Sequence, residues 1–308
     1  MNNNEIMLSI TVPTYGQERY ISQALDSILM QKTQYSFEVL VGEDASPDNT
    51  RKILKDYEKK YPGFFTMIYR DENMKGKNSY DLMCRARGKY LITLEGDDFW
   101  TDENKLEKQI SFLESHPEYM AVAHNCVVVD ENSNPNGERY HECKSEEYTL
   151  EHFFYDIMPG QLATVMQRNY MRDDLFDTSI LNKGLVPGDR LIYFALVCNG
   201  KVHCIQETMS AYRHITTHGT SFSASYRFNF ESEENWYKEL INYARRLNNE
   251  KAVRIAEACY GHWLFMSLKR KNISFSQFKT LFNKIPHRGR VTALSVRKKL
   301  NKNRHDSF

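Results

Sequence analysis

Strand and helix patterns alternate along the chain up to about residue 115, and this alternation is the feature that most constrains the fold. Short apolar runs of strand length end at Pro, Gly or acidic residues, and apolar residues at helical spacing follow each run. The predicted strands are residues 6–12, 37–41, 64–69 and 90–94. This order predicts an α/β protein, with a mostly parallel sheet flanked by helices and joined by right-handed crossovers.

The pattern is less regular beyond this region. Residues 120–129, 162–166 and 202–205 are further predicted strands, and the polar stretch 130–147 is predicted to form a turn or loop. From residue 231 the apolar spacing is helical. We therefore predict an α/β domain over residues 1–228 and a helical C-terminal extension over residues 229–308.

The charge of the chain is distributed unevenly. Residues 269–308 contain twelve Lys or Arg and a single acidic residue, Asp306, whereas the whole chain has a net charge of only +1. A basic tail on an acidic body points to an anionic surface as partner. Two interpretations stay open: a segment that lies on an anionic membrane, and a solvated tail without a partner.

Cysteine usage and the N-terminal residues indicate the compartment. The six cysteines form no CxxC pair, and several lie in apolar runs, which favours a reducing environment. The first residues show neither a basic segment nor the long apolar run of a signal peptide, and no apolar stretch approaches the roughly 20 residues that span a bilayer. We expect a cytoplasmic protein, with peripheral contact to the inner face of the membrane as an option.

Three acidic residues, Glu95, Asp97 and Asp98, directly follow the predicted strand 90–94. Carboxylates so close together repel one another and are costly to desolvate at the end of a buried strand. A divalent cation would offset that cost, and ligands of open α/β sheets bind at the carboxyl ends of strands. A metal–diphosphate site and an acidic turn that caps the next helix are about equally compatible with this cluster alone.

Three other segments follow predicted strands. Tyr15 lies just beyond the first strand, where its ring could stack on a base or pack on the rim. Asp44 follows the second strand and could accept hydrogen bonds from a nucleoside or cap a helix. Lys77 lies beside Gly76 in a segment suited to a diphosphate, although such segments are mostly plain surface turns.

Four stretches in order resemble the successive motifs of family 2 glycosyltransferases with the GT-A fold: SITVPTYGQERYISQALDSILMQ, EVLVGEDASPDNT, ENMKGKNS and GKYLITLEGDDFWTDENKLEKQISFLESHPE. The likeness is close over residues 6–120 and looser to about residue 225. It implies a GT-A nucleotide-sugar transferase of the bacterial surface-polysaccharide type. Such an enzyme would be an inverting hexosyl- or N-acetylhexosaminyltransferase that uses a divalent metal, Mn²⁺ or Mg²⁺.

The resemblance also implies roles for individual residues. Pro13 and Tyr15 would line the base and ribose pocket, Asp44 would bind the uracil or ribose, and Asp97 and Asp98 would share contacts to ribose and metal. Glu95 stands where the family commonly has Asp. Lys77 and Arg213 would contact the donor phosphates, and His214, in the late YRH…THGTS segment, would bind the metal or the diphosphate. The family often has Glu-Asp where this chain has Gly188-Asp189, so Asp189 would be the catalytic base.

Three functions are compared. We expect transfer from a nucleotide-sugar, most simply a UDP-sugar, to a hydroxyl of a glycan or lipid-linked acceptor in polysaccharide biosynthesis. The alternative is a non-catalytic nucleotide-sugar binding module in a glycan-assembly complex, motivated by Glu95 and Gly188. A nucleotidyltransferase would need a glycine-rich basic loop after the first strand, which is absent. Nucleic acid is not an expected partner, and a homodimer remains an option.

Overall fold

The structure is a computed structural model that describes residues 5–215 and 227–305. The chain divides into two compact units. The first, the sheet unit, comprises Met1–Tyr148, Met158–Gly184 and Asn199–Tyr226. The second, the helical unit, comprises Thr149–Ile157, Leu185–Cys198 and Arg227–Phe308. The predicted C-terminal extension thus lies in the helical unit, which also includes two earlier segments.

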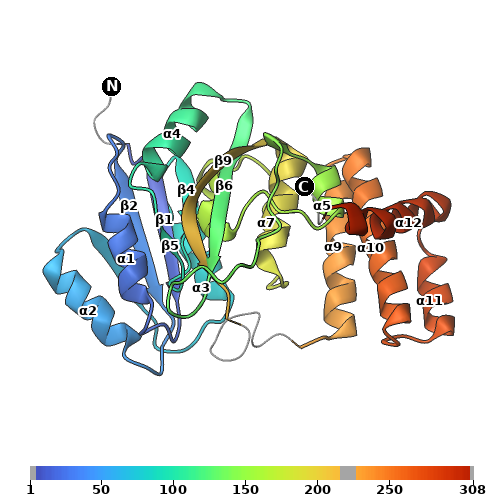
Figure 1. The fold of residues 1–308 in the computed structure, drawn as a ribbon, viewed down its shortest axis with the longest axis horizontal. Coiled ribbons are helices and arrows are strands. Elements are labelled where there is room, and N and C mark those ends of the chain that lie inside the picture. Colours follow the sequence, from blue (N-terminus) through green and yellow to red (C-terminus); the bar gives the residue numbers. More distant parts are fainter. Residues whose placement is uncertain (1–4, 216–226, 306–308) are drawn as a thin grey trace. The chain divides into compact units, whose positions relative to one another are not determined.

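Half of the sheet is parallel and contains the strands predicted from the alternating pattern. The strand order is β3-β2-β1-β4, and all neighbouring strands in this half are parallel. The strands are β1 (Leu8–Thr14), β2 (Phe37–Glu43), β3 (Phe65–Tyr69) and β4 (Tyr90–Thr93). β1 is central, with nearly every residue buried, because helices cover both of its faces (Figure 1). The predicted α/β fold is confirmed.

The other half of the sheet is mixed, in the order β4-β8-β6-β9-β5. Its strands are β5 (Phe99–Trp100), β6 (Tyr119–Val129), β7 (Glu147–Tyr148), β8 (Met166–Arg168) and β9 (Lys201–Arg213). β6 and β9 are parallel, whereas β8 is antiparallel to both β4 and β6. β5 and β7 are each antiparallel to β9. The long strand β9 therefore joins the acidic segment after β4 to the rest of the sheet.

Helices of the sheet unit bury one apolar face against these strands. They are α1 (Ile21–Leu29), α2 (Thr50–Lys60), α3 (Lys77–Arg85), α4 (Lys105–Ser115) and the short α6 (Tyr170–Asp173). In α1 the fully buried apolar residues Ile21, Ala24, Leu25 and Ile28 recur at helical spacing. Burial of the leucine and isoleucine side chains stabilises the fold by about 1.5–3 kcal/mol each.

The prediction of a strand over residues 162–166 is wrong for most of its length. Leu162–Thr164 form a 3₁₀ turn, and only Met166 begins a strand, β8. The side chain of Gln161 accepts a hydrogen bond from the Ala163 amide at 2.7 Å, and this cap favours the turn. The apolar run therefore reflects burial and not an extended backbone.

The helical unit is built around α10 (Glu250–Lys269). Its other helices are α5 (Leu150–Phe154), α7 (Gly188–Asn199), α9 (Phe230–Arg246), α11 (Phe275–Phe282) and α12 (Arg288–His305). Gly261 lets α12 approach α10 closely, since a Cβ atom there would lie 2.1 Å from Val291 Cγ1. No helix in the described part of the chain is long and apolar enough to cross a membrane.

We predict that Gly88→Ala severely destabilises the sheet unit. A Cβ atom at residue 88 would lie 2.4 Å from the Ser9 backbone nitrogen, so the β1 backbone would have to move. Overpacking of this kind costs about 1–3 kcal/mol and sometimes more. Urea unfolding measures the change. Gly76→Ala is the matched control because a Cβ atom there meets nothing within 4 Å, and equal stability of the two variants would contradict the packing.

Candidate functional site

Three of the segments that follow strands lie together at one edge of the parallel half-sheet. The Asp44 amide donates to the carbonyl of Thr14 at 3.0 Å, which joins the end of β2 to the end of β1. The Gly96 amide donates to the carbonyl of Pro13 at 3.3 Å, which joins the segment after β4 to β1. The predicted donor residues Pro13 and Asp44 and the acidic cluster therefore share this edge of the sheet.

The acidic cluster comprises Glu95, Asp97 and Asp98, and Asp98 lies deepest, with 2% of its surface exposed. Its Oδ1 accepts the Arg213 backbone N–H at 2.8 Å, and its Oδ2 accepts the Gln161 amide at 2.7 Å. The same Gln161 nitrogen lies 3.3 Å from Glu95 Oε2. Because donors face both oxygens of Asp98, the geometry suits an ionised carboxylate.

Burial and mutual repulsion oppose that ionisation. Burial raises the pKa of Asp98 well above its ordinary value, and the neighbouring charges of Asp97 and Glu95 raise it further. Burial also raises the pKa of Asp97, although a hydrogen bond from Gln17 acts in the opposite direction. Because these pKa values are raised, the two groups favour the folded state at acid pH, and that contribution is lost as the pH rises through their folded-state values.

A divalent cation fits this chemistry, since hard cations take carboxylate oxygens and would offset the repulsion. The cluster is nevertheless not a complete ligand set: in residues 5–215 and 227–305, no three His, Cys, Asp or Glu side chains form a group that could hold a metal ion. Of the two aspartates, Asp97 is the more exposed, and Asp98 is held by two donors. Asp97 is therefore the better placed to take a metal.

Arg213, at the end of β9, is 3% exposed and its guanidinium is surrounded by acceptors of the protein. It donates to the carbonyls of Asp97 at 2.9 Å and Asp130 at 2.8 Å, and to Gln23 Oε1 at 2.8 Å. It also lies over the Tyr20 ring, 4.3 Å from its centroid. This arrangement braces the backbone of the acidic cluster. The phosphate contact expected of Arg213 stays a prediction, and these bonds favour a structural role.

His214 follows Arg213, and its Nδ1 lies 2.5 Å from Glu138 Oε2. The ring also stacks against Tyr212, with ring centroids 5.8 Å apart. The carboxylate of Glu138 therefore orients the imidazole, as second partners commonly orient metal-binding histidines. The metal contact of His214 stays a prediction, and the rest of its motif, residues 217–221, lies outside the described residues.

The donor-binding residues have different surroundings. Asp44 is 4% exposed, and its Oδ1 accepts the Met74 amide at 2.7 Å, which ties the segment after β3 to the end of β2. Tyr15 is half-buried beyond the end of β1, and Lys77 is exposed at the first position of α3. The Lys77 side chain is thus accessible to a ligand and the Tyr15 side chain is partly exposed, while one oxygen of Asp44 accepts a hydrogen bond from the protein.

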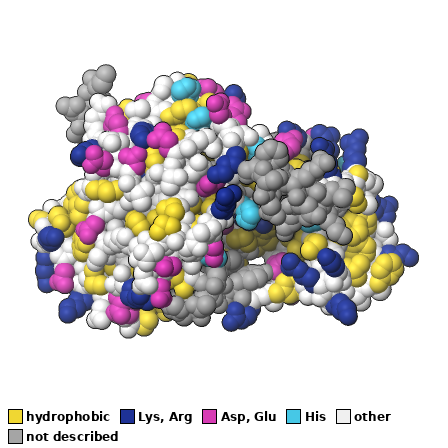
Figure 2. Space-filling view, in the orientation of Figure 1, with side chains coloured by type: hydrophobic (Ala, Val, Ile, Leu, Met, Phe, Trp, Pro, Cys, Tyr) yellow, Lys and Arg dark blue, Asp and Glu magenta, His cyan; other side chains and the backbone are white. Residues whose placement is uncertain are grey.

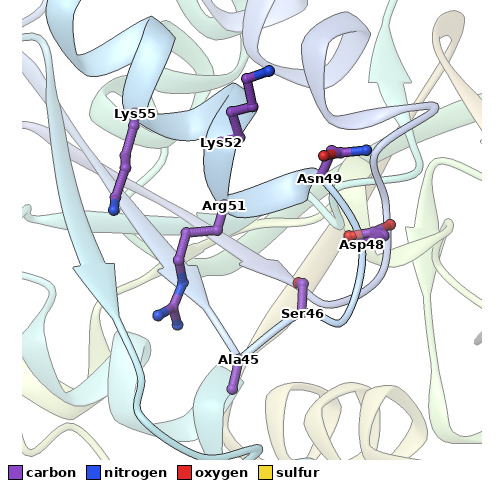
Figure 3. A pocket seen from close by; sticks show the side chains of 7 residues that line it. All are labelled: Ala45, Ser46, Asp48, Asn49, Arg51, Lys52 and Lys55. Atoms are coloured by element: carbon purple, nitrogen blue, oxygen red, sulfur yellow. The ribbon is translucent and has the colours of Figure 1, made fainter.

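A basic pocket of about 490 Å³ begins directly after Asp44 (Figure 3). The residues that line it are Ala45, Ser46, Asp48, Asn49, Arg51, Lys52 and Lys55. Arg51 pairs with the fully buried Glu43, and Arg51 and Lys55 point to the same side of α2 (Figure 3). Sequence patterns did not indicate this pocket, because Arg and Lys on a helix usually mark a solvated face.

Asp189 belongs to the helical unit, in the first turn of α7. Burial raises the pKa of its carboxyl group, and its Oδ1 accepts the Arg190 amide at 2.8 Å. Arg190 itself pairs with Asp156 at 2.8 Å and lies over the Trp236 ring. Asp189 thus has the raised pKa that suits a general base, and its catalytic role stays a prediction.

The chain belongs to glycosyltransferase family 2, because the family model described as Glycosyl transferase family 2 matches residues 9–176. It is 33% identical over 223 residues to uncharacterized proteins of Mycobacterium bovis and Mycobacterium tuberculosis. These alignments cover 70% of this chain and 61% of each relative, so the chain spans about three-fifths of their length.

Two solved structures share the fold. Residues 1–349 of TarS from Staphylococcus aureus, in complex with UDP-GlcNAc, match with a TM-score of 0.67 and 19% identity, over 94% of this chain and 83% of that one. The mannosyltransferase PcManGT from Pyrobaculum calidifontis, in complex with GDP-Man and Mn²⁺, matches with a TM-score of 0.50 and 16% identity, over 99% and 89%. The predicted family and GT-A fold are therefore confirmed.

Two glutamines contact the acidic cluster, and the sequence did not indicate this role for either of them. Gln161 binds Asp98, and Gln17 binds Asp97 and accepts the Thr14 hydroxyl at 2.6 Å. A Cβ atom at Gly96 would lie 2.2 Å from Gln17 Oε1, so Gly96 makes room for this side chain. Glutamine carries no charge or spacing signal, and only the fold brings these residues to the cluster.

We predict that Arg213→Lys lowers the free energy of unfolding by about 3 kcal/mol, since lysine cannot reproduce the planar set of donors. Urea unfolding measures this change, and Arg19→Lys, an exposed arginine of the same unit, is the control, with little expected effect. A variant with unchanged stability but weakened donor binding would instead support the phosphate contact.

Proposed function

We propose that the protein is an inverting glycosyltransferase. It would move a sugar from a nucleotide-sugar, most simply a UDP-sugar, to a hydroxyl of a glycan or lipid-linked acceptor in surface polysaccharide synthesis. The observation that carries the proposal is the acidic cluster at the end of β4, whose ionised form needs a cation, in a chain of family 2. The UDP-GlcNAc of the TarS structure and the GDP-Man and Mn²⁺ of the PcManGT structure support this class of donor and cofactor.

The donor would bind along the edge formed by the ends of β1, β2 and β4. Tyr15 and Pro13 would contact the base, and Asp44 would accept hydrogen bonds from the nucleoside through its second oxygen. Lys77, exposed at the start of α3, would contact the diphosphate as a point charge. Gln161 and Arg213 would hold the acidic cluster in place while the donor is bound.

Asp97 would hold the metal, with Asp98 beside it and His214 as a further contact. A bound Mn²⁺ or Mg²⁺ supplies charge neutralisation at the departing diphosphate, so no protein acid is required there. The protein would contribute carboxylate oxygens at a largely buried position, and Arg213 would hold the backbone of the cluster through the Asp97 carbonyl. The pKa values of Asp97 and Asp98 would then fall, because a cation stabilises the charged forms.

Asp189 would be the general base. In an inverting transfer the acceptor oxygen attacks the anomeric carbon from the face opposite the leaving group. The bond from that carbon to the donor phosphate oxygen breaks, and the acceptor proton moves to the carboxylate. A carboxylate whose pKa is raised by burial is a stronger base than a solvated one, which favours Asp189 for this task.

The second candidate is a non-catalytic nucleotide-sugar binding module. Glu95, in place of the usual Asp, favours it, because the longer side chain already meets Gln161. The two functions differ in one measurement: an enzyme releases nucleoside diphosphate slowly in the presence of donor and metal, whereas a binding module does not.

We predict that Mn²⁺ raises the melting temperature of the wild-type protein at neutral pH and that Asp97→Asn abolishes most of this shift. The shift should shrink as the pH falls, since protonated carboxyl groups do not bind the cation. Differential scanning fluorimetry with and without Mn²⁺ measures both effects. Asp56→Asn, an exposed position on α2, is the control and should keep the full shift. An undiminished shift in Asp97→Asn would place the metal elsewhere.

We predict that Asp189→Asn lowers kcat at least about 100-fold and leaves donor affinity unchanged. In the wild type, kcat/KM should fall on the acid side with an apparent pKa above the ordinary value for Asp, because the base must be ionised and its pKa is raised. Release of nucleoside diphosphate measures turnover, and isothermal titration calorimetry with the nucleotide-sugar measures donor affinity. Glu231→Gln, an exposed acid in the first turn of α9, is the matched control. Full turnover in Asp189→Asn would remove it from this role.

A further inference from the structure

A groove of about 200 Å³ lies within the helical unit, apart from every residue assigned above. Its lining comes from α5, α10 and α12 and from the residue before α12: Glu151, Lys251, Arg254, Ile255, His287, Arg290, Val291 and Leu294. Ile255 and Val291 are buried and Leu294 is half-buried, so the floor is apolar. The charged side chains form the rim. The groove thus combines an apolar surface with a charged edge.

Some charged side chains on the rim have ion-pair partners within the protein, and others do not. Glu151 pairs with Lys251 at 2.9 Å, and His287 lies 3.1 Å from the buried Glu257, which also binds Arg245. The side chains of Arg254 and Arg290 have neither a hydrogen-bond partner nor an ion-pair partner among the residues that the structure describes. The two acids near the groove are therefore already neutralised, and two arginine side chains remain available at its edge.

The surroundings of the groove are also basic. The first turn of α12 contains Arg288 and Arg290 and no acidic residue. Residues 269–308 contain twelve Lys or Arg and one acid. On the visible face of the helical unit, Lys and Arg side chains are scattered with few Asp or Glu among them (Figure 2). An approaching anionic surface would be attracted by the whole segment and could be held at the groove.

We propose that this groove binds the phosphate headgroup of an anionic phospholipid and so docks the helical unit on an anionic bilayer. Arg254 and Arg290 would contact the phosphate, for which the guanidinium fork is well suited. Ile255, Val291 and Leu294 would pack against the first methylene groups of the lipid. A soluble phosphate would use the arginines but gain nothing from the apolar floor, and this difference favours the lipid. The inference does not depend on the proposed transferase activity.

The test is co-sedimentation of the full chain with vesicles of phosphatidylcholine, with and without phosphatidylglycerol. The wild type should bind only vesicles that contain phosphatidylglycerol. Arg254→Gln/Arg290→Gln should weaken this binding at least about tenfold, as expected for the loss of two basic groups at the surface. Both arginines are exposed, so the variant should keep its fold, which its melting temperature checks.

The matched control is Lys269→Gln/Lys279→Gln, which removes the same charge from exposed positions of the same unit outside the groove. Its binding should fall less than about threefold. Equal losses of vesicle binding in the two double variants would contradict the groove as the binding site and would indicate diffuse attraction between the basic segment and the bilayer. Binding of glycerol phosphate as tight as that of a short-chain phosphatidylglycerol would overturn the lipid as occupant. A dimer of the wild type that the groove variant converts to a monomer in sedimentation velocity would assign the groove to a second copy instead.

Discussion

The contacts of Arg213 are the interactions on which the acidic site depends. Its guanidinium joins the carbonyl of Asp97, the carbonyl of Asp130 at the end of β6 and the side chain of Gln23 on α1, while its amide binds Asp98. Three segments that are distant in the sequence are thereby held around one buried cation. Without it, the Asp97 carbonyl would lose its guanidinium donor, whereas the Asp130 carbonyl would keep the Ser133 amide as a partner at 3.1 Å.

The acidic cluster places opposite demands on the fold. The donors to Asp98 favour its ionised form, and burial together with Asp97 and Glu95 disfavours it. The positive charge of Arg213 lowers the pKa values of Asp97 and Asp98 and so offsets part of this repulsion. In the proposed transferase, a bound divalent cation would stabilise this site at neutral pH, and cation binding and folding would then be coupled. The carboxylate oxygens of the cluster are the ligand type that a hard cation prefers, which is why we propose a divalent cation there.

The two units satisfy their buried charges in different ways. In the sheet unit, the carboxyl groups of Glu95, Asp97 and Asp98 lie close together at the end of β4, and burial and the neighbouring charges raise the pKa of Asp98. In the helical unit, the carboxylate of Glu257 is enclosed by Arg245 and His287, and the surplus is positive, at Arg254 and Arg290. These opposite charges fit the two proposals: a metal-dependent nucleotide-sugar site in the sheet unit and a lipid-binding groove in the helical unit.

The sequence by itself determined the parallel half-sheet, because the spacing of apolar residues and the residues that end each strand are local signals. The order of four motifs identified the family. The sequence also placed Pro13, Asp44, Asp97 and Asp98 together, because carboxyl ends of parallel strands meet at one edge. Only the tertiary structure decided the surroundings of Arg213, whose partners lie after β6, on α1 and after β4. It also decided that Gln17 and Gln161 contact the acidic cluster. The 3₁₀ turn at Leu162–Thr164 and the inclusion of residues 149–157 and 185–198 in the helical unit were equally hidden. The reason is physical: an apolar run reports burial, whereas a hydrogen-bond partner or a packing neighbour is chosen by residues far along the chain.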